Sequence, residues 1–334
     1  MREPPFWWRE PGPAARLLAP AAATYGLIAA ARLRRTGRRA SIPVVCVGNL
    51  TVGGGGKTPT AMAVARLFLR AGLRPAFLTR GYGGALVGPV QVGASARAAE
   101  VGDEPLLLAR VAATIVARDR IAGAGVGVRE NADVIVMDDG LQNPSLVKDA
   151  AIVALDGRRG IGNGCVIPAG PLRAPLAVQL DHVDAVLVVG DAGESAHDVI
   201  REAQRRNLPI FAGRLEPAGP VVAELKERRL LAFAGIADPA KFFATLAHAG
   251  LIVAAAVDFP DHHTYSSADA ARLIARAERE GLQLVTTEKD AARLHGDPAL
   301  AALAAGCKPF PVTLVVEDEE RFRGFLRERT ALPL

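Results

Sequence analysis

The segment that most constrains the fold spans residues 44–60. It joins a β-branched apolar run to four consecutive glycines and then to Lys57-Thr58. A helical pattern rich in alanine and leucine follows over residues 61–70, so the segment predicts a strand, a loop and a helix. Glycines allow backbone N–H groups to wrap around an oxyanion, and a helix N-terminus adds a partial positive charge. This order of elements indicates a phosphate-binding loop.

Individual residues of this loop have expected roles. The Lys57 amine would reach the outer phosphates, the Thr58 hydroxyl would ligate Mg²⁺, and Pro59 suits a first helical turn. Thr51 stands where the strict motif has a glycine. A flexible glycine-rich linker is the alternative interpretation, and the strand and helix on either side argue against it. The expected nucleotide-binding residues are Asn49, Thr51, Gly53, Gly54, Gly55, Gly56, Lys57, Thr58 and Pro59.

The remaining pattern predicts an α/β protein of 334 residues in which strands alternate with helices. We expect a parallel sheet with helices on both faces, like that of P-loop NTPases, and a second, smaller α/β domain. The expected divisions are an N-terminal segment 1–40, a core 41–217 and a smaller domain 218–334. Strands are expected at 74–79, 113–117, 131–140, 150–155, 185–189 and near 210, and in the smaller domain at 230–234, 251–257, 282–286 and 311–316.

The N-terminal segment carries an uncharged run, residues 17–31, between Phe6-Trp7-Trp8 and a cluster of five arginines at positions 32–39. The run is shorter than the roughly 20 residues of a spanning helix, and Pro20 would kink it or mark its start. We expect a membrane-associated helix with the arginines on anionic headgroups and the following domain on the cytoplasmic side. A helix packed on the protein's own core is the alternative. The net charge is +5, but no recognised nucleic-acid-binding motif accompanies the arginine cluster, which favours the membrane interpretation.

A second motif is the apolar strand that ends in Asp138-Asp139-Gly140. Carboxylates at a strand end beside a phosphate loop are typical of Mg²⁺-nucleotide sites, whereas alone they would be ordinary turn residues. We therefore expect Thr58, Asp138 and Asp139 to hold the metal, without choosing between the two aspartates.

Five further segments stand out, and four of them carry candidate residues. Arg80 and Tyr82 lie in a glycine-rich loop after a predicted strand, where open α/β sheets bind ligands. Asp103 begins a helical run, where capping is the ordinary alternative, and Arg173 is a candidate phosphate clamp. His262, in Asp261-His262-His263, suits proton sharing with a carboxylate better than zinc binding, because no further ligands occur at plausible spacing; a purely structural histidine is also possible. Residues 287–290, Thr-Glu-Lys-Asp, follow another predicted strand.

These motifs indicate a nucleoside triphosphate enzyme. The guanine-specifying order Asn/Thr-Lys-x-Asp does not occur in the sequence, which disfavours a GTP switch. The remaining interpretation is an enzyme that transfers a phosphoryl group from ATP to a metabolite or a lipid.

Seven motifs in order resemble the tetraacyldisaccharide 4′-kinase family of lipid A biosynthesis, from the N-terminal apolar segment almost to the C-terminus. They are the glycine loop with its Val47-Gly48-Asn49-Leu50-Thr51 lead, 80–84, 102–105, 138–142, 168–173, 261–263 and 286–290. Thr51 belongs to this family's version of the loop. Asn143 and Ala174 depart from the family pattern, which usually has histidine and an acidic residue there. If that acidic side chain helps to hold the metal in relatives, the metal site of this chain has fewer oxygen ligands.

The resemblance implies a kinase that uses Mg²⁺ and ATP to phosphorylate the 4′-hydroxyl of an acylated glucosamine disaccharide 1-phosphate, giving lipid IVA. It would act at the cytoplasmic face of the inner membrane, with Lys57 on the phosphates, Asp103 as base and His262 as its partner. No protein partner or nucleic acid is expected. The alternatives are a soluble P-loop kinase or ligase-like enzyme for a polar metabolite, and a regulatory ATP-binding module without transfer.

Overall fold

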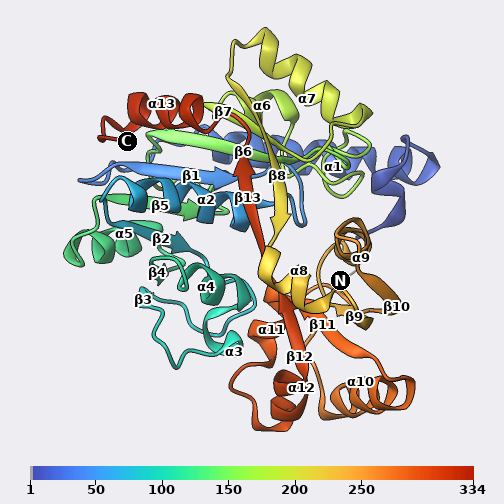
Figure 1. The fold of residues 1–334 in the computed structure, drawn as a ribbon. Helices are drawn as coiled ribbons and strands as arrows, with labels where there is room; N and C mark the ends of the chain where they lie inside the picture. Colours follow the sequence, from blue (N-terminus) through green and yellow to red (C-terminus); the bar gives the residue numbers. More distant parts are fainter. Residues whose placement is uncertain (1–2) are drawn as a thin grey trace.

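The computed structural model describes residues 3–334, so residues 1 and 2 of the expected segment 1–40 lie outside it. Two β-sheets organise the described chain (Figure 1). The larger contains β1 (Val44–Gly48), β2 (Pro75–Thr79), β3 (Val90–Gln91), β4 (Ala113–Val116), β5 (Val134–Asp138), β6 (Ala150–Asp156), β7 (Ala185–Val189), β8 (Ile210–Pro217) and β13 (Val312–Val316). Their order is β13-β8-β7-β6-β1-β5-β2-β4-β3. Pairing is parallel except at the edges, where β13 and β3 are antiparallel to their neighbours.

The smaller sheet is parallel throughout, in the order β10-β9-β11-β12. Its strands are β9 (Arg229–Ala234), β10 (Ile252–Asp258), β11 (Gln283–Thr287) and β12 (Cys307–Phe310). The helices of the described residues are α1 (Pro13–Leu33), α2 (Lys57–Arg70), α3 (Ala98–Val101), α4 (Asp103–Leu108), α5 (Arg120–Arg129), α6 (Leu176–Leu180), α7 (Glu194–Arg205), α8 (Gly219–Leu225), α9 (Pro239–His248), α10 (Ser267–Glu280), α11 (Glu288–Leu294), α12 (Ala301–Gly306) and α13 (Glu319–Thr330), with 3-10 turns η1 (Pro5–Trp8) and η2 (Pro298–Leu300).

The larger sheet is covered on both faces, as expected. Along β1, Val45 and Val47 enter a core shared with α2 and α13, while Val44 and Cys46 enter a core shared with α5 and α7. All four side chains are almost completely buried. A strand buried on both faces needs a continuous apolar run rather than an alternating one, which explains the sequence of β1.

The assignment of residues 311–316 to the smaller sheet was wrong. That segment forms β13, which pairs antiparallel with β8 at the edge of the larger sheet. The fourth strand of the smaller sheet is instead β12, which the sequence pattern missed because Pro309 interrupts the apolar run. The chain thus leaves the larger sheet after β8 and returns at β13, and the two connections touch where Ala218 N donates to Pro311 O (3.0 Å).

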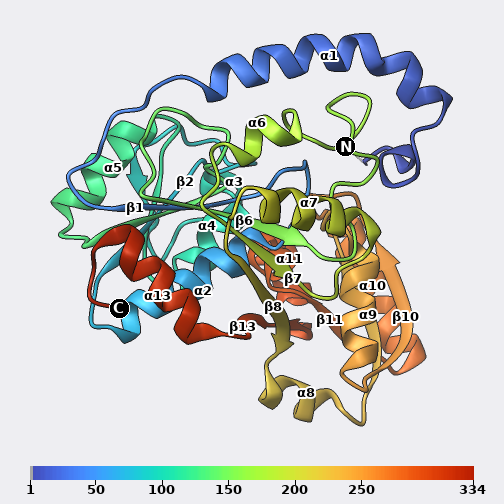
Figure 2. The same cartoon turned by 90° about the horizontal axis from the view of Figure 1, so that it is seen from above.

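Helix α1 lies along the outside of the part of the chain that contains the larger sheet (Figure 2). Pro20 lies within the helix. Small residues form most of its buried face, and a Cβ added at Gly26 would lie 3.5 Å from Pro175. The opposite face exposes Leu17 (82%), Leu27 (74%) and Ile28 (66%). By length and composition alone the helix could cross a membrane, but its inner face is packed along the protein: Ala15, Ala22, Gly26, Ala30 and Leu33.

Candidate active site

The glycine loop connects β1 to α2. Gly53 (φ +94°) and Gly56 (φ +80°) take left-handed backbone conformations that favour glycine. The Lys57 amine donates to Gly53 O (3.0 Å), and the Asn49 amide donates to the same oxygen (3.2 Å). Lys57 is buried, and this burial lowers the pKa of its amine. The negative charge of Asp139 acts in the opposite direction and raises it. Pro59 lies in the first turn of α2, which begins four residues earlier than the apolar pattern suggested.

Thr51 is buried and pairs antiparallel with Leu172. Two hydrogen bonds flank this bridge, from Val52 N to Pro171 O and from Arg173 N to Leu50 O, both 2.9 Å long. The start of the loop is therefore held against residues 171–173. Since Thr51 sits in a strand-like bridge, this position does not require the glycine of the strict motif.

The two carboxylates at the end of β5 have different surroundings. Parallel pairing aligns Asp138 with Val47 of β1, and the Thr58 hydroxyl donates to Asp138 Oδ2 (3.0 Å). Asp138 Oδ1 is buried without a hydrogen-bond partner among the described residues. Burial, together with the charges of Glu104 and Asp139, raises the pKa of Asp138 to about 7.

Asp139 is instead bound by Arg173, whose Nη1 and Nη2 donate to its two carboxylate oxygens at 2.8 and 3.1 Å. The Lys57 amine lies 3.8 Å from Asp139 Oδ2. Burial opposes ionisation here, but these two cations hold the pKa of Asp139 at about 2. Within residues 3–334, no group of three or more His, Cys, Asp or Glu side chains is arranged to hold a metal ion. A cation at this strand end would therefore also need hydroxyl, phosphate or water oxygens.

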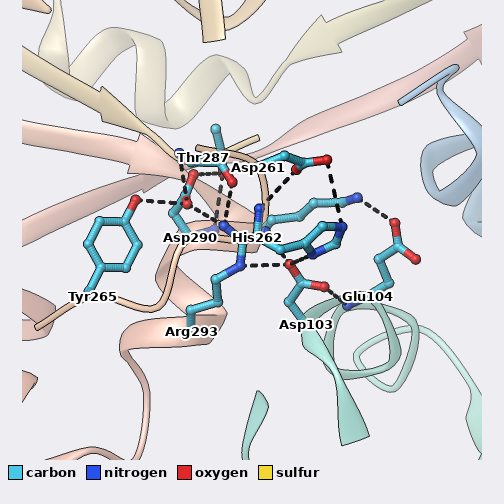
Figure 3. A network of polar contacts seen from close by, with 10 residues as sticks. Asp103, Glu104, Asp261, His262, Tyr265, Thr287, Asp290 and Arg293 are labelled. Atoms are coloured by element: carbon cyan, nitrogen blue, oxygen red, sulfur yellow. Dashed lines mark hydrogen bonds and ion pairs between the residues drawn. The ribbon is translucent and has the colours of Figure 1, made fainter. Parts of the chain in front are cut away.

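Asp103 and His262 meet between the two sheets, although they are 159 positions apart in the sequence. Figure 3 shows both side chains, with His262 Nδ1 3.4 Å from Asp103 Oδ2. Asp103 begins α4 and is 3% exposed, so it is not a solvent-facing cap. The neighbouring Glu104 acts electrostatically on both Lys57 and Asp138, which places the start of α4 beside the phosphate loop.

The three expected substrate residues lie in different places. The exposed Tyr82 ring lies 4.9 Å from the His262 ring. Arg80 is exposed just before it in the chain. Arg173 is on the other side of the site, where it binds Asp139, Thr51 O (2.8 Å) and Gln142 Oε1 (3.1 Å). Tyr82 therefore joins the Asp103–His262 pair, and Arg173 joins the phosphate loop.

Comparison with known proteins identifies the family. The model of the family described as tetraacyldisaccharide-1-P 4′-kinase, LpxK, matches residues 14–331. The tetraacyldisaccharide 4′-kinase of Rhodopseudomonas palustris (strain BisA53) is 52% identical over 98% of this chain and 95% of the relative. That of Methylobacterium radiotolerans is 52% identical over the whole of both chains. This chain belongs to the tetraacyldisaccharide 4′-kinase family.

The fold agrees with this membership. The solved structure of LpxK from Aquifex aeolicus, in complex with ATP, superposes with a TM-score of 0.72 at 25% identity and covers 95% of this chain and 99% of that chain. The two departures noted in the sequence have simple surroundings in this tetraacyldisaccharide 4′-kinase. Asn143 Oδ1 accepts from Ser145 N (2.8 Å) and Oγ (2.6 Å) and so shapes a turn. The Ala174 side chain is completely buried and supplies no oxygen ligand.

Sequence reasoning missed Arg120 of this kinase. Its side chain is 3% exposed, Nη1 donates to Ala117 O (2.5 Å), and Nε is buried without a partner among the described residues. Burial lowers the pKa of the Arg120 guanidinium, whereas the negative charges of Asp139 and Asp138 raise it. The one available signal was Asp119, whose side chain accepts from Ile121 N and Ala122 N and so marks the start of α5.

Glu3 was also missed. Its Oε2 accepts from Trp8 Nε1 and Arg159 Nη1, both at 3.0 Å. Its Oε1 is buried without a described partner, and a Cβ added at Gly53 would collide with it. Burial raises the pKa of Glu3. The N-terminal segment therefore places a carboxyl group directly against the phosphate loop.

Proposed function

We propose that this protein transfers the γ-phosphate of ATP to the 4′-hydroxyl of a tetraacyl glucosamine disaccharide 1-phosphate, giving lipid IVA in lipid A biosynthesis. The observation that carries the proposal is family membership over residues 14–331. The site geometry supports it, because Asp103 pairs with His262 while its chain neighbour Glu104 acts electrostatically on Lys57 of the phosphate loop.

On the donor side, the loop amides and the Lys57 amine would bind the ATP phosphates. Asn49 supports the loop, Thr51 fixes its start, and Pro59 lies in the first turn of the helix whose N-terminus would face the phosphates; Gly53, Gly54, Gly55 and Gly56 supply backbone without side chains. Lys57 now donates to Gly53 O, so ATP binding would exchange that carbonyl for phosphate oxygens. Arg173 would hold Asp139 and contribute positive charge.

The residues present fit Mg²⁺. Thr58 and Asp138 form the pair that P-loop enzymes use for this ion, and Asp138 Oδ1 is a buried oxygen with no hydrogen-bond partner within residues 3–334. Thr58, Asp138 and Asp139 would hold the ion together with phosphate and water oxygens. When bound, Mg²⁺ neutralises phosphate charge.

On the acceptor side, Asp103 would accept the proton of the 4′-hydroxyl and His262 would orient the carboxylate or share that proton. Tyr82, whose ring lies beside that of His262, and the exposed Arg80 would contact the sugar and its phosphate. We assign residues 41–217 and the returning 312–334 to the donor unit, and residues 218–311 to the unit that brings His262 to it.

For localisation we propose the cytoplasmic face of the inner membrane. The exposed Leu17, Leu27 and Ile28 would enter the lipid, while the small residues of α1 stay packed on the protein. Because the inner face of α1 is buried along its length, we infer that the helix lies in the interface and does not span.

The test is transfer of radiolabelled γ-phosphate from ATP to the disaccharide 1-phosphate in mixed micelles. We expect stoichiometric, Mg²⁺-dependent phosphorylated lipid. A protein that stays in the supernatant without detergent and ignores acylated acceptors would instead be a kinase for a polar metabolite. Nucleotide binding without any phosphorylated product would indicate a regulatory module.

A further inference from the structure

The Thr287–Asp290 segment is the one conspicuous motif that the proposed function leaves without a role. It ends β11 and begins α11, on the smaller sheet. Its charged residues contact the region around α4: Lys289 Nζ donates to Glu104 Oε1 (2.6 Å), and Glu288 accepts from Arg110 (3.4 Å). The segment is therefore an attachment between the smaller sheet and the start of α4.

Asp290, the last residue of the motif, forms a buried socket. It is completely buried, and its Oδ1 accepts from Tyr265 Oη (2.8 Å) and Gly235 N (3.0 Å), while Oδ2 accepts from Thr287 Oγ1 (2.6 Å). One turn later on α11, Arg293 inserts its Nη1 into this socket and donates to Asp290 Oδ1 (2.8 Å) and Gly235 O (2.6 Å). These contacts fix the plane of the guanidinium.

The other edge of the same guanidinium reaches Asp103. Arg293 Nε (2.7 Å) and Nη2 both donate to Asp103 Oδ2, the oxygen that His262 Nδ1 approaches (Figure 3). The Arg293 and Asp103 side chains are 8% and 3% exposed. The smaller sheet thus delivers two side chains to one carboxylate oxygen of the donor unit.

We propose that Arg293 is a positioning residue for phosphoryl transfer, held by the Thr287–Asp290 motif so that it keeps the Asp103 carboxylate ionised and in a fixed orientation. The inference rests on the proposed function, in which Asp103 receives the acceptor proton. In this role Arg293 acts on the reaction only through Asp103 and does not contact the substrate.

The charges around Asp103 support this role. Burial alone would favour the protonated acid; His262, Arg293 and Lys289 instead hold the pKa of Asp103 well below its usual range, while Glu104 is its neighbour on α4. Arginine remains charged at any working pH and binds a carboxylate through a rigid fork, so Lys289, a point charge paired with Glu104, does not substitute for it.

The test compares Arg293→Met and Arg293→Lys with the wild type in the lipid phosphorylation assay, alongside ATP-analogue binding and circular dichroism. We expect Arg293→Met to lower kcat by on the order of 10²-fold with little change in the Kd of ATP, since misplaced catalytic groups cost about that much. Its kcat–pH profile should gain an acid limb above about pH 4, because loss of the cation raises the pKa of Asp103. This acid limb should persist when His262→Gln is added to Arg293→Met. Its persistence would assign the limb to titration of Asp103 and not of the His262 imidazole.

Arg293→Lys should keep the acid limb at low pH, because the positive charge remains. It should recover only part of kcat, because the planar guanidinium fork that orients the carboxylate is lost. If Arg293→Met fails to fold, the lysine variant decides, with a kcat equal to that of the wild type counting against the inference. Arg110→Met is the matched control, since Arg110 also joins α11 to the donor unit but at the surface, and its acid limb should not move.

Two outcomes are distinguishable. A folded Arg293→Met variant with normal kcat or an unmoved acid limb, beside an inactive Asp103→Ala, overturns the inference and leaves the proposed function standing. A wild-type protein that does not phosphorylate the disaccharide overturns both.

Discussion

The Thr58 hydroxyl donates to Asp138 Oδ2 at 3.0 Å and joins the first turn of α2 to the end of β5. Both side chains are buried. Replacing Thr58 with valine keeps the shape and removes the oxygen. We expect activity to fall by roughly 10–100-fold, the usual loss when a metal-site ligand or its support is removed. Steady-state kcat across a Mg²⁺ titration measures this, and Thr58→Ser, which keeps the hydroxyl, is the control that should stay near wild type.

Asp103→Ala should cut kcat by on the order of 10² to 10⁴ while ATP still binds, because proton transfer and orientation are lost and the phosphate loop is untouched. Single-turnover transfer and equilibrium ATP binding separate the two effects. Asp318→Ala is a suitable control for simple capping, since Asp318 accepts from Arg321 N at the start of α13. Near-normal turnover of Asp103→Ala would remove it from the mechanism.

Glu3→Gln should tighten ATP binding. Glu3 Oε1 lies against Gly53 of the phosphate loop, so an ionised carboxylate there repels bound phosphate. At a partly screened distance of several ångströms, one removed charge corresponds to about 1 kcal/mol, or roughly 5-fold in Kd. The exposed Glu10 provides the matched variant, Glu10→Gln, whose Kd should equal that of the wild type. An unchanged Kd for Glu3→Gln would contradict the expectation.

Acid should unfold the protein through carboxylates whose pKa is lowered in the native state. Burial opposes ionisation of Asp103, Asp139 and Asp156, but cations near each hold the pKa below the usual 3.8. A lowered native pKa stabilises the fold above the unfolded value, and that stability is lost as pH falls through the native value. The Tm measured by calorimetry should therefore drop steeply below about pH 4. Asp156→Asn, which breaks the 2.6 Å contact with Lys241, should make the drop shallower.

Charged residues on the outer face of α1 should release the protein from membranes. Leu27 and Ile28 are 74% and 66% exposed, so Leu27→Glu/Ile28→Glu leaves the fold intact. Each apolar side chain contributes about 2 kcal/mol when buried, so vesicle binding should weaken at least roughly 10-fold. Sedimentation with anionic vesicles measures this. Leu69→Glu, at a position 41% exposed on α2, is the control and should sediment like the wild type.

Local sequence predicted the regular elements well where pattern and caps agreed. Strand β7 has the expected bounds, and α10 begins with a Ser266–Asp269 capping box that can be recognised in the sequence. Helix α5 was missed because its glycines lower helix propensity. The structure supplies their reason: Cβ atoms at Gly123 and Gly127 would lie 2.5 and 2.6 Å from side chains of the sheet, so glycine lets α5 pack closely.

The site divides in the same way. Lys57 and Thr58 begin α2 after the glycine loop and Asp138 ends β5, so recognisable motifs predicted their proximity, and the expected pairing of Asp103 with His262 came from the family resemblance. Arg293 meets Asp103 across 190 positions, and no local pattern specifies that contact. Glu3 lies against Gly53 of the loop and is held there by Arg159, which is 156 positions away from it in the sequence. Such contacts depend on how the two sheets and the N-terminal segment dock, which periodicity does not encode.

The last helix has a consequence for how the enzyme is made. Phe322 and Leu326 of α13 are completely buried in the same core as Phe68 of α2, the helix that follows the phosphate loop. During synthesis, α2 emerges early and stays uncovered until the smaller unit and then α13 have left the ribosome. Domains ordinarily fold from the N-terminus as they appear, but here the ATP-binding half waits for the end of the chain. A stop codon a few residues before α13 would thus expose the core beneath the phosphate loop, although every residue of the proposed site had been translated.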